Sequence, residues 1–204
     1  LQNIVEDTPF DNLPAKWHDF EFSRFSSDKT LFGFQQNGLR NALKALWLFY
    51  KEKKGKKELL FKQYRANGLS SNFDYDLTRE RKAAGHLLDF DKDYPITDNK
   101  IAFAHFINRM SFWMATGSGK TLIIVKLIDM LGSLMRQKEI PQNDILFLAH
   151  RDDLLEQFKN HIDQFNSFNF ETRINLKSLK DYESVKRENA LPFAKNEITV
   201  FYYR

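Results

Sequence analysis

Cysteine is absent from the 204-residue chain, so disulfides, thiolate metal ligands and cysteine nucleophiles are all excluded. No apolar run is long enough to span a membrane, and the N-terminus lacks a signal-peptide pattern. We therefore expect a cytoplasmic protein with no membrane partner. The net charge is only +4, which permits a nucleic-acid partner without requiring one. Glycine is scarce as well, with eight residues, yet two of them stand close together near the middle of the chain.

Those two glycines belong to residues 114–121, which read Met-Ala-Thr-Gly-Ser-Gly-Lys-Thr. This is the pattern of a glycine-rich loop, in which successive backbone N–H groups turn inward around the phosphates of a nucleotide. Lys120 can reach the β- and γ-phosphates, and the Thr121 hydroxyl can hold Mg²⁺. The general pattern has glycine where this chain has Met114. The predicted nucleotide-binding residues of the loop are Thr116, Gly117, Ser118, Gly119, Lys120 and Thr121.

The sequence around the loop predicts an α/β fold. Residues 111–114, Ser-Phe-Trp-Met, indicate a short buried strand before the loop, and residues 122–128 open a helix whose positive N-terminus would face the phosphates. Beyond this point strands and helices alternate, which favours a parallel sheet covered by helices. The expected strands are 111–115, 144–149, 171–176 and 198–203, and the expected helices are 119–136 and 152–165. Because the chain begins without methionine and stops at a core-type strand, we expect it to be an excerpt of a longer protein.

The region before residue 110 is less regular. Residues 1–30 show no clear periodicity, whereas apolar residues recur at helical spacing from 36 to about 50. The lysine-rich run 51–57 is interpreted as a solvated turn in preference to a phosphate-binding patch. Short helices are expected at 57–66, 78–89 and 98–108, the last with Asp98 as its N-cap.

A second informative segment spans residues 144–158. A strand ends at Ala149, and a helix begins near Asp152 with acidic residues in its first turn. Ligands of open α/β sheets meet the carboxyl ends of strands, so Arg151 is placed to contact a nucleic-acid phosphate. The alternative is a surface arginine paired with a carboxylate, and taken alone this alternative is favoured.

The phosphate loop, followed about 25 residues later by a strand and by His-Arg-Asp-Asp-Leu-Leu-Glu-Gln-Phe at 150–158, resembles superfamily-2 helicases and translocases. The resemblance is closest to the motor subunits of type I and type III restriction enzymes. These often carry Met-Ala-Thr-Gly-x-Gly-Lys-Thr, which makes Met114 a family variant.

A third element agrees with this resemblance. Residues 31–39, Leu-Phe-Gly-Phe-Gln-Gln-Asn-Gly-Leu, resemble the aromatic–glutamine element that reads adenine in this family. Phe34 would stack on the base, and Gln35 would hydrogen-bond both the donor and the acceptor of the adenine edge; Gln36 is the fallback. The alternative is a glutamine that caps an ordinary helix.

The resemblance implies a RecA-like P-loop NTPase sheet with helices on both faces, preceded by a mainly helical N-terminal region. It implies ATP and Mg²⁺ as ligands, Lys120 and Thr121 as catalytic residues, and double-stranded DNA as partner, with methyltransferase or specificity subunits of a restriction complex as further partners. The implied organisation has four parts. They are an irregular segment (residues 1–30), an adenine-reading element and helix (31–50), a helical insertion (51–109) and the first part of a RecA-like domain (110–204).

One family element is absent from the sequence. The family hydrolyses ATP with an Asp-Glu motif, and no Asp-Glu pair follows Thr121. The second RecA-like domain, with its arginine finger, would also lie downstream. We therefore expect this chain alone to bind nucleotide weakly and hardly to turn it over. Two other functions stay open, a P-loop NTPase of the small-molecule kinase type and a non-catalytic nucleotide-binding fragment.

Overall fold

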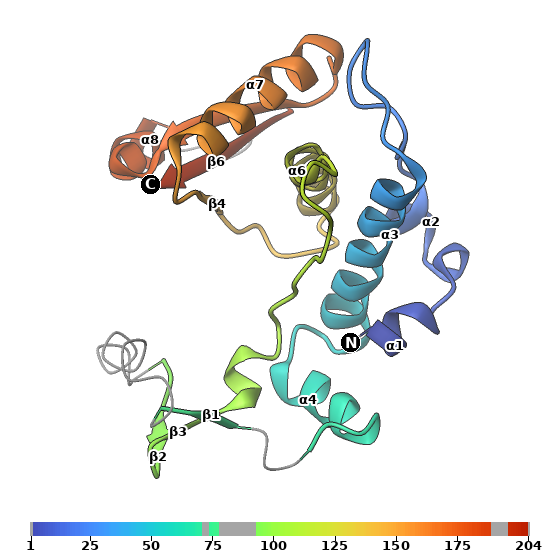
Figure 1. Cartoon of the computed structure of the whole chain (residues 1–204), viewed down its shortest axis with the longest axis vertical. Coiled ribbons are helices and arrows are strands. Elements are labelled where there is room, and N and C mark those ends of the chain that lie inside the picture. The colour runs from blue at the N-terminus through green and yellow to red at the C-terminus, as the bar shows by residue number, and fades with distance from the viewer. Residues whose placement is uncertain (1, 71–73, 78–92, 189–195, 204) are drawn as a thin grey trace. The chain divides into compact units, whose positions relative to one another are not determined.

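A computed structural model gives the arrangement of the chain (Figure 1). It describes most of the 204 residues, namely 2–70, 74–77, 93–188 and 196–203. The chain divides into two compact units. Unit 1 comprises residues 1–7 and 45–112, and unit 2 comprises residues 8–44 and 113–204.

Unit 2 is built on a parallel three-stranded sheet. Its strands are β4 (Ile145–Leu148), β5 (Arg173–Ser178) and β6 (Glu197–Tyr203), in the order β4-β6-β5. Its helical elements are η1 (Phe10–Asn12), α2 (Ala15–His18), α3 (Gly33–Trp47, which ends in unit 1), α6 (Lys120–Arg136), α7 (Asp152–Phe168), η4 (Leu179–Asp181) and α8 (Tyr182–Glu188). The three strands, α6 and α7 match their predicted positions to within three residues, and the predicted helix from 36 to 50 is α3.

Helices pack on both faces of this sheet, although Leu146, Leu148 and Tyr203 on the second face stay exposed. On one face, Phe147 of β4 stacks on Phe158 of α7, with ring centroids 3.9 Å apart. Phe147 pairs with Tyr202 in the ladder, so the preceding residue of β6, Phe201, points to the opposite face. There it meets Tyr182 at the start of α8, at a centroid distance of 4.9 Å. Figure 1 shows α7 running along the sheet.

The sequence explains why α7 forms and which face it buries. Aspartates 152 and 153 occupy its first turn, where the helix dipole favours negative charge. Its buried residues recur at spacings of three and four, which gives one apolar stripe. They are Leu155, Phe158, Ile162 and Phe165.

The segment at residues 8–32, which precedes α3, contributes to the same core. Trp17 and Phe25 are fully buried, although residues 8–32 contain only short helical turns. The Trp17 indole donates to Glu139 Oε2 at 3.0 Å, and the Phe25 ring lies 5.8 Å from that of Phe165. Two large aromatic side chains thus fix an otherwise irregular segment.

One predicted strand, at the boundary between the two units, is wrong. Residues 111–115 form no strand, and Trp113 is 95% exposed where burial was expected. A strand needs a hydrogen-bonded neighbour, and within the described ranges no segment pairs with these residues. Three of its five residues are large and apolar, yet only Met114 among them is half-buried.

Unit 1 combines short helices with a small antiparallel sheet, in which β3 lies between β1 and β2. Its strands are β1 (Asp74–Asp76), β2 (Ile96–Thr97) and β3 (Lys100–Ala102). Its helical elements are α1 (Gln2–Glu6), the π-helical turn η2 (Leu48–Glu52), α4 (Lys57–Ala66) and η3 (Phe103–Phe106). Its core contains Ile4, Leu48, Leu60 and Ile107.

The predictions for this unit have mixed outcomes. The helix at 57–66 is confirmed as α4. The helix at 98–108 is wrong, because Asp98 and Asn99 have φ values of 50° and 56° and form the turn between β2 and β3. Two successive left-handed residues suit a tight hairpin turn, which ends any helix there. The helix predicted at 78–89 lies outside the described residues.

No helix in the described part of the chain is both long and apolar enough to span a membrane.

The approach of α6 to β6 depends on a glycine. A Cβ at Gly132 would lie 2.6 Å from Cγ1 of Ile198, which is buried in the core at 1% exposure. We predict that Gly132→Ala lowers the free energy of unfolding by about 1–3 kcal/mol through overpacking. Gly38 is the matched control, since it also lies inside a helix and has nothing within 4 Å of its Cβ position.

Gly38→Ala should therefore stabilise the protein by about 0.5–1 kcal/mol. Urea unfolding of both variants measures these effects. Equal effects of the two substitutions would contradict the close packing of α6 on β6.

Candidate nucleotide-binding site

The loop before α6 has the backbone of a phosphate cradle. Gly117 and Gly119 have φ values of 78° and 74°, in the left-handed region that glycine enters without steric cost. The Ser118 N–H donates to the Ala115 carbonyl at 3.2 Å, which closes a turn. Gly119 is the N-cap of the 17-residue helix α6, so the first N–H groups of the helix lie at the end of the loop.

Lys120 lies back along this loop. Its Nζ donates to the carbonyl oxygens of Met114 and Ala115, each at 2.7 Å. Both acceptors are neutral carbonyls, and no ion pair involves this ammonium among the described residues. The charge of Lys120 is therefore held beside the loop without being neutralised.

Thr121 follows in the first turn of α6, and its hydroxyl donates to Gln157 Oε1 at 3.1 Å. This bond directs the hydroxyl proton toward Gln157, which lies in α7. Both lone pairs of Oγ1 remain available as acceptors or metal ligands. Gln157 was not predicted as a site residue, and no local motif could have identified it, because it meets Thr121 across 36 residues of sequence.

Gln35 connects α3 to the loop. Its Oε1 accepts from the Phe32 N–H at 2.7 Å, and its Nε2 donates to the Ser118 carbonyl at 2.7 Å. The side chain is buried, and a Cβ at Gly119 would lie only 2.5 Å from its Nε2. Gln36, the fallback residue, instead donates to the Leu31 carbonyl at 2.9 Å. Of the two glutamines, Gln35 is therefore the one that contacts the phosphate loop.

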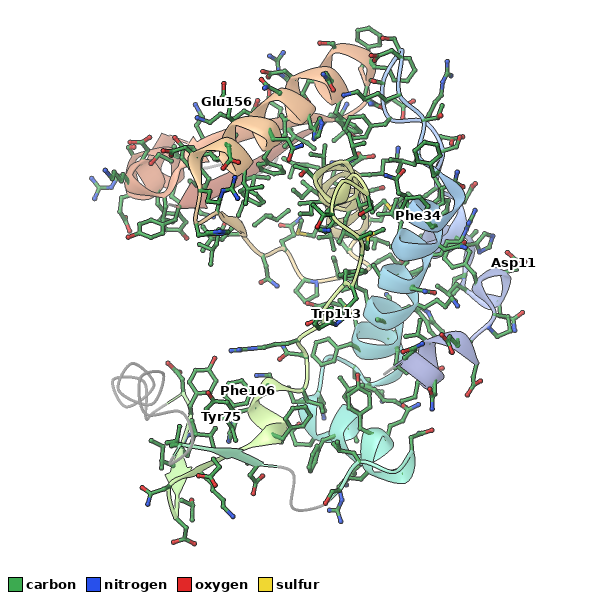
Figure 2. The ribbon with its side chains drawn as sticks, in the orientation of Figure 1. Asp11, Phe34, Tyr75, Phe106, Trp113 and Glu156 are labelled. Atoms are coloured by element: carbon green, nitrogen blue, oxygen red, sulfur yellow. The ribbon has the colours of Figure 1, made fainter. Side chains whose placement is uncertain are left out.

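Phe34 lies beside this contact on the first turn of α3 (Figure 2). Its ring stacks on that of Phe32, with centroids 5.9 Å apart and planes 12° from parallel. The two residues are 52% and 66% exposed, which is unusual for phenylalanine. A pair of flat apolar rings thus faces outward next to the glutamine that holds the loop.

Arg151 follows the carboxyl end of β4 and pairs with Asp153 in the first turn of α7. The guanidinium Nε donates to Asp153 Oδ1 at 2.8 Å, and a second nitrogen contacts Oδ2. These hydrogen bonds lower the pKa of Asp153 and raise that of Arg151. The arginine is exposed, so the described structure shows the carboxylate pairing that the sequence left open as the alternative to a phosphate contact.

The left-handed glycine loop, the long helix that begins at Lys120 and the three-stranded parallel sheet with helices packed on both faces are those of a P-loop NTPase with an incomplete RecA-like fold. Comparison with protein families gives the particular group. The family described as "Type III restriction enzyme, res subunit" matches residues 30–203, and the chain belongs to it. The chain is thus a helicase-superfamily-2 domain, as its resemblance implied. Comparisons with curated proteins and with solved structures gave no match.

The close contact between Gly119 and Gln35 yields a prediction. Gly117→Ala and Gly119→Ala each place a side chain at positive φ, which costs about 1–2 kcal/mol. The Cβ position at Gly117 has nothing within 4 Å, whereas the one at Gly119 meets Gln35. Gly119→Ala should therefore destabilise the protein more than Gly117→Ala does.

A double-mutant cycle with Gln35→Ala isolates the contact. We expect the additional cost of Gly119→Ala, measured by thermal unfolding, to disappear when Gln35 is alanine. An unchanged difference between the two glycine variants would show that Gln35 does not rest on Gly119.

Proposed function

We propose that this chain binds ATP with Mg²⁺ through the loop at 114–121 and serves as the nucleotide-binding part of a DNA translocase or helicase in a restriction system. The observation that carries the proposal is the Gln35–Ser118 hydrogen bond, which joins the candidate adenine-reading element to the phosphate loop. Family membership favours this function over a small-molecule kinase, because the matched family is that of a restriction-enzyme subunit.

The phosphates would be held by the loop and by the start of α6. The backbone N–H groups from Gly117 to Lys120 and the helix dipole favour an anion there. The Lys120 ammonium, held now by two neutral carbonyl oxygens, would exchange them for phosphate oxygens, whose negative charge makes stronger hydrogen bonds. Bound ATP would supply a phosphoanhydride bond whose cleavage releases free energy.

Magnesium fits the first turn of α6 by the chemistry of its donors. Mg²⁺ is usually bound by one or two protein oxygens together with substrate phosphates and water. Thr121 Oγ1 offers its lone pairs because its proton is donated to Gln157. No cluster of three or more metal-binding side chains occurs in the described ranges, so most ligands of the ion would come from ATP and water.

Adenine recognition would use the second N–H and the second acceptor lone pair of the Gln35 amide. One N–H of Nε2 and one lone pair of Oε1 are engaged with the protein, and a primary amide has one more of each. That pair matches the acceptor and donor that adenine presents at N7 and N6. Phe34, exposed beside it, would stack on the base.

Double-stranded DNA would lie at the carboxyl edge of the sheet, where Arg151 could exchange its Asp153 partner for a phosphate. Methyltransferase or specificity subunits of a restriction complex are the further partners that this function would bring. Because no Asp-Glu pair follows Thr121, the chain alone would bind ATP with little turnover.

The first test concerns Lys120. Lys120→Ala removes a charge-assisted contact worth about 1.5–3 kcal/mol, so the Kd of a non-hydrolysable ATP analogue with Mg²⁺ should rise about 10- to 100-fold. Lys62→Ala, an exposed lysine on α4, is the control and should leave the Kd unchanged. Isothermal titration calorimetry provides the measurement, and equal affinity of the Lys120 variant and the parent chain would refute the assignment of the loop.

The second test concerns Gln35. Gln35→Ala should weaken ATP binding more than GTP binding, because the guanine edge does not offer the donor and acceptor pattern that the amide reads in adenine. The measurement is the ratio of the two affinities in the parent chain and in the variant. If both affinities fall by the same factor, Gln35 only positions the loop and does not read the base.

A further inference from the structure

The positive charge of the chain is concentrated in one short part of unit 1. Residues 51–65 contain seven lysines and arginines and two glutamates, a net +5, whereas the whole chain has a net charge of +4. The remainder of the chain is therefore almost neutral. A concentrated basic segment on a nearly neutral protein indicates a site for an anionic partner.

The lysines of this segment are held by an ordered backbone. Lys54 and Gly55 are both left-handed, with φ values of 53° and 68°, and form the turn between η2 and α4. The Gly55 N–H donates to the Phe49 carbonyl, and the Lys56 N–H donates to the Lys53 carbonyl, both at 2.9 Å. Lys54 and Lys56 are exposed on this turn. The turn thus presents two neighbouring ammonium groups to solvent from a backbone of defined conformation.

The first turn of α4 is fastened to η3. The Lys57 ammonium donates to the His105 carbonyl at 3.0 Å. Phe106, the next residue, therefore lies at the same end of α4 as the lysine-rich turn.

Phe106 is the centre of a cluster of flat side chains. Tyr94 stacks on it with centroids 5.1 Å apart and planes 8° from parallel, and the Tyr75 ring lies 6.1 Å away (Figure 2). The Arg109 guanidinium lies 4.7 Å from the centroid of Phe106, and its Nη2 donates to the Tyr94 hydroxyl at 3.1 Å. Arg109 is exposed and the three rings are half-buried, so the cluster is accessible and its orientation is fixed.

We propose that unit 1 binds single-stranded nucleic acid, with phosphates on Lys54 and Lys56 and an unpaired base stacked on Tyr94, beside Phe106 and Arg109. Basic groups that follow the backbone, combined with aromatic rings that stack on bases, are the means by which proteins bind single strands. The lysines suit duplex and single strand equally, but the ring cluster needs a base that is not already stacked inside a duplex. None of these residues belongs to the phosphate loop, so the proposal goes beyond nucleotide binding.

The experiment measures fluorescence anisotropy of the full 204-residue chain with a labelled oligothymidine of about 16 nucleotides, over about 50–200 mM salt and without nucleotide. The double variant Lys54→Gln/Lys56→Gln should make the negative slope of log affinity against log salt less steep by about 1.4, since each single-strand phosphate contact contributes about 0.7. A loss of ATP binding has no influence on this assay, so the two proposals can fail independently.

The control removes the same charge elsewhere. Lys138 is also exposed and also left-handed, with φ 59°, and Lys180 is exposed; both lie in unit 2. Lys138→Gln with Lys180→Gln should leave the slope unchanged. An equal change in the two double variants would mean that net charge alone matters, and the proposal would be overturned.

Stacking is tested at Tyr94. Tyr94→Phe keeps the ring and should bind within about twofold of the parent chain, whereas Tyr94→Leu loses it and should bind about 5- to 100-fold more weakly. Circular dichroism checks that both variants are folded, and the lysine variants keep the proposal testable if Leu is not tolerated. Equal affinity of the Phe and Leu variants would overturn the proposal. The proposal would also be overturned if the Lys54 and Lys56 substitutions changed the salt slope only with a labelled duplex of the same length and not with the single strand.

Discussion

The hydrogen bond from the Gln35 amide to the Ser118 carbonyl is the contact on which the nucleotide site depends. It joins residues 83 positions apart and places the start of α3 against the phosphate loop. It forms only because position 119 has no side chain, since a Cβ there would lie 2.5 Å from the amide nitrogen. Gly119 therefore has two roles, a left-handed backbone and a close approach. An L-residue at this position would disturb both the loop and the element beside it.

The first turn of α6 shows how the protein prepares polar groups for a charged ligand. Lys120 is bonded to two neutral carbonyl oxygens, and Thr121 donates its proton to Gln157. In each case the partner holds the side chain in place without using the charge or the lone pairs that a phosphate or Mg²⁺ would need. Positioning of this kind lowers the cost of ordering side chains when the ligand binds.

Local sequence patterns predicted much of unit 2. The apolar stripe of α7 and its acidic first turn can be recognised within one short stretch of sequence. The glycine pair of the loop likewise predicts the left-handed backbone that both glycines adopt. The predicted strand at 111–115 failed because a strand depends on a neighbour, which its own sequence does not specify. Gln157 and the bonds of Gln35 were missed for the same reason, since they are contacts between segments far apart in sequence.

In unit 1 the errors came from turn chemistry. Asp98 is a good helix N-cap by residue type, but with Asn99 it adopts the left-handed turn of a hairpin, and both uses rely on the same short polar side chain. The lysine run does form a turn between η2 and α4, but its preferred interpretation as merely solvated is the one that our proposal for unit 1 replaces with phosphate binding. What the sequence could not show is that Lys57 fastens this turn to the element that carries Phe106.

The central claim is that residues 31–39 and 114–121 form one nucleotide site. Hydrogen–deuterium exchange of the chain, with and without ATP and Mg²⁺, tests it most directly, because exchange reports on each segment separately. We expect peptides from both segments to become protected together when ATP is added, and Lys120→Ala to abolish both effects. Protection of the loop alone, or of neither segment, would contradict it.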